Sequence, residues 1–219
     1  YRVVVVMIKR QMKKGKWVAL GAFLALIGGL VAGNIIFNER LDEYYYTSAY
    51  VEPEFEKLGR NVVKAFGIKK RFFHIEFFQL TIDKPGLGKK GDYIGLECNM
   101  RPPGGYTPDL INFANSCDVY QIYADSMAFD ENRQDLTKEK FFACCASRRF
   151  DKNYLYSDSN ILETYKNDIC HYGVYPRVLA GAMGDKFYMA KFKTLKEVEP
   201  DDLSLASCPT VFIDAIKDI

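Results

Sequence analysis

The chain has 219 residues, 48% of them hydrophobic and 15% aromatic, and a formal net charge of +2 at pH 7. This length is enough for one large domain or two small ones. The apolar content excludes a disordered protein, and the nearly balanced charge gives no support for a nucleic-acid-binding protein. Because the chain starts at Tyr1 rather than Met, we expect it to be part of a longer protein.

Residues 17–37, with the sequence WVALGAFLALIGGLVAGNIIF, form a run of 21 residues without a charge. As a helix this run would span roughly 30 Å, enough to cross a membrane. A basic segment, 9–16, precedes it and an acidic segment, 38–43, follows it, which would keep the N-terminus in the cytoplasm. Four glycines in the run instead favour buried strands or a core helix. Residues 1–37 are therefore either a membrane helix or part of a buried core.

The next segments predict a strand, a helix and a hairpin. Tyrosines 44–46 are interpreted as a strand, and segment 53–66 has apolar residues at helical spacing, with a proline in the first turn and a glycine after the last. Segment 71–80 alternates and is rich in Phe and Ile, so it predicts a strand, and 92–99 predicts a second strand. The polar, Gly-rich segment 81–91 joins them, so we expect an antiparallel hairpin with an extended loop.

The C-terminal half predicts further helices and strands. Segment 107–129 indicates one or two helices with Thr107 as the N-cap, and 140–150 a strand. Segment 157–168 predicts a short helix capped by serine, and 177–198 predicts strands joined by a turn. Helices mixed with antiparallel strands define an α+β fold: an antiparallel sheet with flanking helices.

Cysteine spacing gives no support for a zinc or redox motif, because no C-x-x-C pair occurs. We interpret the six cysteines as reduced and mostly buried thiols of a cytosolic protein. They are Cys98, Cys117, Cys144, Cys145, Cys170 and Cys208.

The predicted hairpin brings polar side chains together. Side chains two residues apart in a strand share a face, which groups Glu97 with Asn99 and Arg101. If the two strands pair in the matching register, Glu76 converges on Glu97 and Asn99. Two carboxylates and an amide oxygen suit Mg²⁺, and Arg101 could hold a phosphate or carboxylate oxygen. A solvated strand face with a surface ion pair is the alternative, but the aromatic-rich hairpin favours buried acids.

Other polar residues of this region are given structural roles. His74 shares the Glu76 face; it is either a ligand or base or, as we favour, a satisfied structural histidine. Gly104 and Gly105 either let a backbone approach a substrate or form a turn after the two prolines. Arg148 and Arg149 suit an exposed strand end.

Three segments resemble a known family: FFHIEFFQL (72–80), YIGLECNMRPPGG (93–105) and DLINFANSCDVYQIYA (109–124). They resemble the C-terminal lobe of the ATP-grasp ligases, near the carbamoyl-phosphate synthetase and carboxylate–amine ligase branch. GAMGD (181–185) is similar to a later part of the same lobe. The resemblance covers about residues 50 to 190, and we place the lobe at 38–199.

The resemblance implies a role for each matching residue. Glu97 would bridge two Mg²⁺ ions, Asn99 would bind the second ion and Glu76 would complete the first, with Mn²⁺ as an alternative metal. Phe78, on the Glu76 face, would pack against the adenine or ribose of ATP. Arg101 would be the catalytic residue that stabilises charge on the transferred phosphoryl group or acyl phosphate.

The resemblance also implies an activity. ATP would phosphorylate a small carboxylate, and an amine would displace the phosphate to form a carbon–nitrogen bond. The family's second lobe, which covers the phosphates, should lie upstream, so we expect this chain to hold only part of the enzyme. We expect a cytoplasmic protein, since an ATP site outside the cell would meet little nucleotide; residues 200–219 would form a tail or helix.

Two other functions remain as alternatives. The first is a non-catalytic, membrane-tethered or structural remnant of an ATP-grasp domain, anchored through residues 17–37. The second is a metal-free binding domain, which predicts no stabilisation by Mg²⁺ and nucleotide.

Overall fold

The computed structural model describes residues 40, 42, 44–80 and 82–194. Their elements are, in order, β1 (Tyr44–Thr47), α2 (Pro53–Ala65), β2 (His74–Gln79), β3 (Tyr93–Asn99), α3 (Thr107–Asn115), α4 (Val119–Phe129), β4 (Phe142–Arg148), α5 (Asp158–Thr164), β5 (Ile169–Val174), α6 (Arg177–Met183) and β6 (Lys186–Phe192). The predicted α+β class is confirmed.

The predictions for residues 1–37 and 200–219 lie outside the described residues. Among the helices that the structure does describe, none has the length and apolar character needed to cross a membrane.

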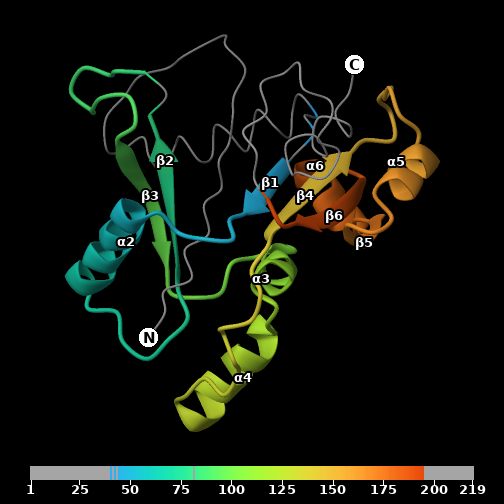
Figure 1. Ribbon diagram of the computed structural model, residues 1–219. Coiled ribbons are helices and arrows are strands. Elements are labelled where there is room, and N and C mark those ends of the chain that lie inside the picture. The colour runs from blue at the N-terminus through green and yellow to red at the C-terminus, as the bar shows by residue number, and fades with distance from the viewer. Residues whose placement is uncertain (1–39, 41, 43, 81, 195–219) are drawn as a thin grey trace.

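The strands of the described region form two separate antiparallel sheets (Figure 1). One sheet has four strands in the order β1-β4-β6-β5, and the other is the β2–β3 hairpin. In Figure 1 the hairpin and α2 stand on one side, and the four-stranded sheet with α5 and α6 on the other. A two-stranded sheet is marginal alone, so the hairpin needs packing on at least one face.

Strand β4 runs through the middle of the main core and is buried on both faces. Its alternate residues Ala143 and Cys145 pack with α3, through Leu110. Its other alternate residues, Cys144 and Ala146, pack in the cluster that contains the α5 side chain of Ile161. Because successive side chains of a strand point to opposite faces, a run of small apolar residues suits a strand that is covered on both sides.

Helix α2 supplies the packing that the hairpin needs. Phe55 is 3% exposed, and its ring centroid lies 5.4 Å from that of Phe77 on β2 and 4.8 Å from that of Tyr93 on β3. As predicted, Pro53 stands in the first turn and Gly67, at φ +62°, follows the end of the helix. These aromatic contacts fix one face of the hairpin and leave the other for polar groups.

Two predictions about secondary structure were wrong, and one strand was missed. Residues 177–183 form helix α6 rather than a strand; Pro176 precedes this helix, and Gly184, at φ +101°, ends it before β6. Strand β5, at the edge of the sheet, was not predicted, because its half-buried and exposed residues show no regular alternation and its pairing shifts near Cys170. Thr107 is the first residue of α3 and the N-cap is Tyr106, without a side-chain cap.

The predicted exposure of Arg148 and Arg149 was also wrong, because both are 1% exposed. The Arg148 guanidinium donates to Tyr156 O at 2.8 Å and to Asp158 Oδ1 at 3.2 Å. Arg149 Nη1 donates to the Ala180 carbonyl of α6 at 2.6 Å. A buried guanidinium is tolerated where carbonyl and carboxylate oxygens receive its N–H groups.

Candidate metal centre

The hairpin pairs in the register on which the expected convergence of Glu76, Glu97 and Asn99 depends. Glu76 lies directly opposite Glu97, and His74 lies directly opposite Asn99. The register then shifts by one residue, so that Phe77 pairs with Gly95, and β3 carries one more residue than β2 across this point. All four polar side chains stand before the shift and therefore share one face, which we call the carboxylate face.

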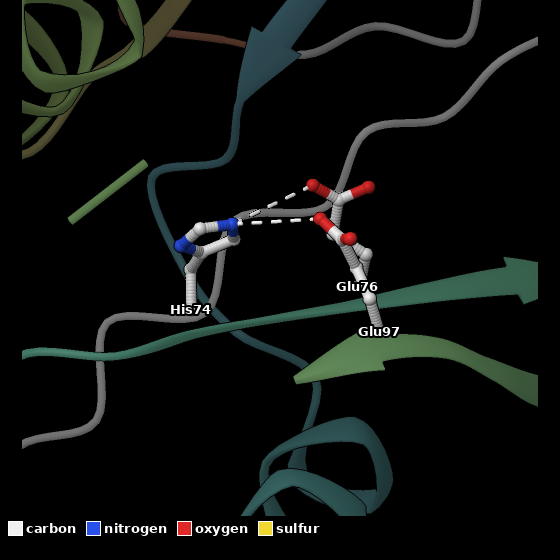
Figure 2. Close-up of side chains that lie close together, drawn as sticks. All are labelled: His74, Glu76 and Glu97. Carbon is white, nitrogen blue, oxygen red and sulfur yellow. Dashed lines mark ion pairs between the residues drawn. The ribbon is translucent and has the colours of Figure 1, made fainter. Parts of the chain in front are cut away.

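Three side chains of the carboxylate face point toward one another (Figure 2). His74 Nε2 lies 3.7 Å from Glu76 Oε1 and 3.7 Å from Glu97 Oε1. Each of these three residues offers one ligand atom, and the three atoms lie within 4.8 Å of one another. Among the described residues, this is the group of histidine, cysteine and acidic side chains whose geometry could hold a metal ion.

Asn99 lies between the histidine and one carboxylate. Its Nδ2 donates to Glu97 Oε1 at 2.6 Å and lies 2.9 Å from His74 Nε2. His74 Nδ1 lies 2.9 Å from the carbonyl oxygen of Arg101. Since a carbonyl oxygen only accepts, Nδ1 carries the proton, and Nε2 accepts from Asn99. The Nε2 lone pair is therefore directed toward the carboxylate face.

The site is less buried than the sequence led us to expect. The His74 side chain is 6% exposed, but that of Glu76 is 27% exposed and that of Glu97 is 46% exposed. Because the acids partly face solvent, a ligand can reach them. The histidine forms the closed side of the site and the carboxylates form its open side.

Phe78 pairs with Ile94 on the far side of the register shift, and both are half-buried. Alternation along β2 places Phe78 on the same face as Glu76, as predicted. An apolar surface therefore continues from the carboxylates along the hairpin, as a planar ring of a ligand would require.

Arg101 differs from the arrangement that strand alternation predicted, because β3 ends at Asn99. Its exposed side chain donates to the carbonyl oxygen of Pro102 at 3.0 Å. Its own carbonyl oxygen is the one that accepts from His74. Arg101 thus touches the site through its main chain, and its guanidinium lies beside the loop that follows β3.

Cys98 is directed away from the candidate site. It pairs with Ile75, and both residues alternate with the carboxylate face. Burial raises the pKa of the Cys98 thiol, which keeps it protonated and a poor metal ligand at neutral pH. The five cysteines in the part of the chain that the structure describes are not in disulfides, and Cys208 lies outside it.

An apolar hollow of about 460 Å³ lies beside the loop that follows β3. Its lining includes Phe72, Pro102 and Pro103, together with two tyrosines of α4, Tyr120 and Tyr123. Burial, followed by the hydrogen bond that Tyr120 donates to Asp109, raises the pKa of Tyr120 to about 12. The prolines therefore face the hollow, and the tyrosine beside them stays un-ionised at neutral pH.

Sequence reasoning placed Glu76, Glu97 and Asn99 together, and the structure brings them together. For His74 it favoured a structural role over that of a ligand or base. The same alternation that grouped Glu76 with Phe78 also grouped His74 with them, so it could have identified this residue. The missing information was the pairing of His74 with Asn99 and the direction of its Nε2, which depend on the register of the hairpin.

Comparison with protein-family models gives no match, and no curated protein matches the chain. Among solved structures, the chain is similar to the crystal structure of phosphoribosylglycinamide synthetase from Anaerococcus prevotii, with a TM-score of 0.47 and 16% sequence identity. The similarity covers 80% of this chain and 44% of that one, so the chain spans less than half of the synthetase.

Proposed function

We propose that the chain carries the metal- and nucleotide-binding hairpin of an ATP-dependent carbon–nitrogen ligase of ATP-grasp type. The observation that carries this proposal is the pairing of Glu76 with Glu97, next to Asn99, on one face of the hairpin. Two carboxylates placed directly opposite each other repel, so this arrangement is unfavourable unless a cation lies between them.

The donor set fits Mg²⁺. Glu76 and Glu97 offer carboxylate oxygens, which are the ligands that Mg²⁺ takes, and a small number of protein ligands leaves room for water and phosphate oxygens. Asn99 now turns its Nδ2 toward Glu97, and it would offer its oxygen once a cation displaces that hydrogen bond and the amide rotates. The exposure of both carboxylates supports access by a phosphate chain. Mg²⁺ in such a site would neutralise the charge of the phosphates.

Two further residues have roles in this proposal. Arg101, whose exposed guanidinium now donates to a neighbouring carbonyl, would bind an oxygen of the transferred phosphoryl group. The half-buried Phe78 and Ile94 would form the apolar surface against which adenine or ribose packs. These residues position the nucleotide and stabilise charge, which is the main contribution a protein makes to phosphoryl transfer.

In the proposed reaction, a carboxylate oxygen of the substrate attacks the γ-phosphorus of ATP, the bond to ADP breaks, and an acyl phosphate forms. An amine nitrogen then attacks the acyl carbon, phosphate leaves with the bonding electrons, and the amine loses a proton. Arg101 would stabilise the negative charge of the phosphoryl group in the first step and of the leaving phosphate in the second.

Trapping of the acyl phosphate tests the proposal. The longest natural form of the protein, supplied with Mg²⁺, ATP, a panel of small carboxylates and hydroxylamine, should form a hydroxamate from one class of carboxylate. Glu97→Gln should abolish its formation. Glu163→Gln, which neutralises an exposed acid of α5 that pairs with Lys166, should leave it unchanged. Hydroxamate formation that survives Glu97→Gln, or none with any carboxylate, would contradict the proposal and favour a non-catalytic domain.

A further inference from the structure

The nitrogen of His74 is positioned as a metal ligand would be. Its side chain is 6% exposed, and its Nε2 lies at the same distance, 3.7 Å, from one oxygen of each glutamate. Metal–ligand bonds of about 2.1 Å hold neighbouring ligand atoms roughly 3 Å apart, so a small inward rotation of the two partly exposed carboxylates would close the three atoms around an ion.

The other ring nitrogen supports the same role. A metal-bound histidine almost always donates its second N–H to a carbonyl or carboxylate, which fixes the tautomer and the direction of the ring. His74 Nδ1 donates to the carbonyl oxygen of Arg101 at 2.9 Å, so Nε2 keeps a lone pair. That lone pair now accepts from Asn99, and Nε2 lies 3.7 Å from an oxygen of Glu76 and of Glu97.

The hydrogen bonds of Asn99 indicate where an ion would lie. Its Nδ2 donates to Glu97 Oε1 at 2.6 Å and is 2.9 Å from His74 Nε2. Two of the three candidate ligand atoms therefore accept from one amide, whose positively polarised hydrogens point into the space between them. A cation at this position would replace that amide as the partner of both atoms.

We infer that His74 is a nitrogen ligand of the ion held by Glu76 and Glu97, and that the centre therefore selects Mn²⁺ over Mg²⁺. The inference rests on the metal site of the proposed function, but not on the ligase reaction. Mg²⁺ takes oxygen ligands, whereas an imidazole suits transition metals, and Mn²⁺ accepts both imidazole and the carboxylate and phosphate oxygens of this site.

Mn²⁺ bound to the protein without nucleotide provides a direct test, because electron spin echo envelope modulation detects nitrogen bonded to Mn²⁺. Protein of natural isotopic composition should show modulation from an imidazole ¹⁴N, and protein labelled with ¹⁵N at histidine should show the ¹⁵N pattern instead. The labelled wild-type protein decides the question even where a variant fails to fold.

The sequence contains two histidines, so two variants are needed to identify the one whose nitrogen binds Mn²⁺. His74→Gln should remove the modulation and weaken Mn²⁺ binding about tenfold or more, while changing Mg²⁺ binding less. His171→Gln should leave both unchanged, because His171 lies on β5 and its ring contacts Tyr106 and Phe187.

The possible results separate this inference from the ligase proposal. Bound Mn²⁺ without histidine modulation, modulation that survives His74→Gln, or equal losses of Mn²⁺ and Mg²⁺ affinity would overturn the role of His74. Hydroxamate formation together with any of these results would leave the ligase proposal standing. Histidine modulation without hydroxamate formation would support the metal centre and overturn only the ligase proposal.

Discussion

Glu76 lies directly opposite Glu97 across the β2–β3 hairpin, and His74 Nε2 is 3.7 Å from a carboxylate oxygen of each. Cross-strand pairs of like charge destabilise a sheet, so the protein without metal keeps an unfavourable contact at this point. The face behind the carboxylates is fixed by aromatic packing with α2, which holds the two acids in place.

The first prediction concerns the cost of that contact. In the absence of divalent metal, Glu97→Gln should raise the free energy of unfolding by about 0.2–1 kcal/mol, because it removes the repulsion while the Gln oxygen can still accept from Asn99. Urea denaturation with a chelator present measures the change. A fall in stability would show that the two acids are not an unfavourable pair.

The second prediction tests the packing that supports the hairpin. Phe55→Ala should lower the free energy of unfolding by about 3–5 kcal/mol, because a buried ring that contacts Phe77 and Tyr93 is lost. Phe66→Ala, at the end of the same helix but 68% exposed, should change it by less than about 0.5 kcal/mol. Equal effects of the two variants in chemical denaturation would contradict this account of the hairpin.

The third prediction concerns the response to acid. Burial on its own would raise the pKa of Asp158. Its hydrogen bonds with Lys186 and Tyr188 and the charge of Arg148 together have a larger effect, so the pKa of Asp158 lies below the ordinary 3.8. This stabilisation is complete above the unfolded-state pKa and is lost as pH falls through the lower folded pKa. Asp158→Asn should therefore destabilise the protein at pH 7, by about 1–3 kcal/mol, and flatten the loss of stability below roughly pH 4.

Asp168 provides a control of opposite sign, because burial raises its pKa. A raised folded pKa lowers stability as pH increases through it, so Asp168→Asn should stabilise the protein at pH 7. Thermal unfolding measured from pH 2 to 8 separates the two variants. An unchanged acid response in Asp158→Asn would contradict the role given to its ion pairs.

The fourth prediction concerns the turn between α6 and β6. Gly184 has φ +101°, and a Cβ there would lie 2.7 Å from Ser147 Cβ. Gly184→Ala should therefore lower the free energy of unfolding by about 1–3 kcal/mol or more. Gly104→Ala, where a Cβ would meet nothing within 4 Å, should be neutral or slightly stabilising. A neutral Gly184→Ala would show that this turn accepts another conformation.

Strand alternation predicted most of the candidate site, because a period of two depends only on neighbouring residues and the matching register brought Glu76 to Glu97. Alternation does not predict where a strand ends. Strand β3 ends at Asn99, so Arg101 does not lie on the face that alternation assigned to it. The burial of Arg148 escaped prediction because its partner Asp158 belongs to a separate helix, and tertiary contacts override composition.

The other errors concern strand β5 and the short helix α6. Strand β5 has no buried residue and its pairing shifts near Cys170, so it carries little of the hydrophobic pattern on which strand prediction depends. The sequence of α6, RVLAGAM, is short and apolar, and a short apolar segment does not distinguish a helix from a strand.

The most direct test of the metal- and nucleotide-binding hairpin is the melting temperature of the longest natural form of the protein, measured with ATP in the presence of Mg²⁺ and again with a chelator. Our account predicts that Mg²⁺ with ATP raises Tm, that the chelator removes the increase, and that Glu97→Gln abolishes it while Glu163→Gln retains it. At a concentration of ATP 100 times its Kd, the stabilisation would be about 2.7 kcal/mol. An unchanged Tm in the wild-type protein, or an equal increase in Glu97→Gln, would contradict the account.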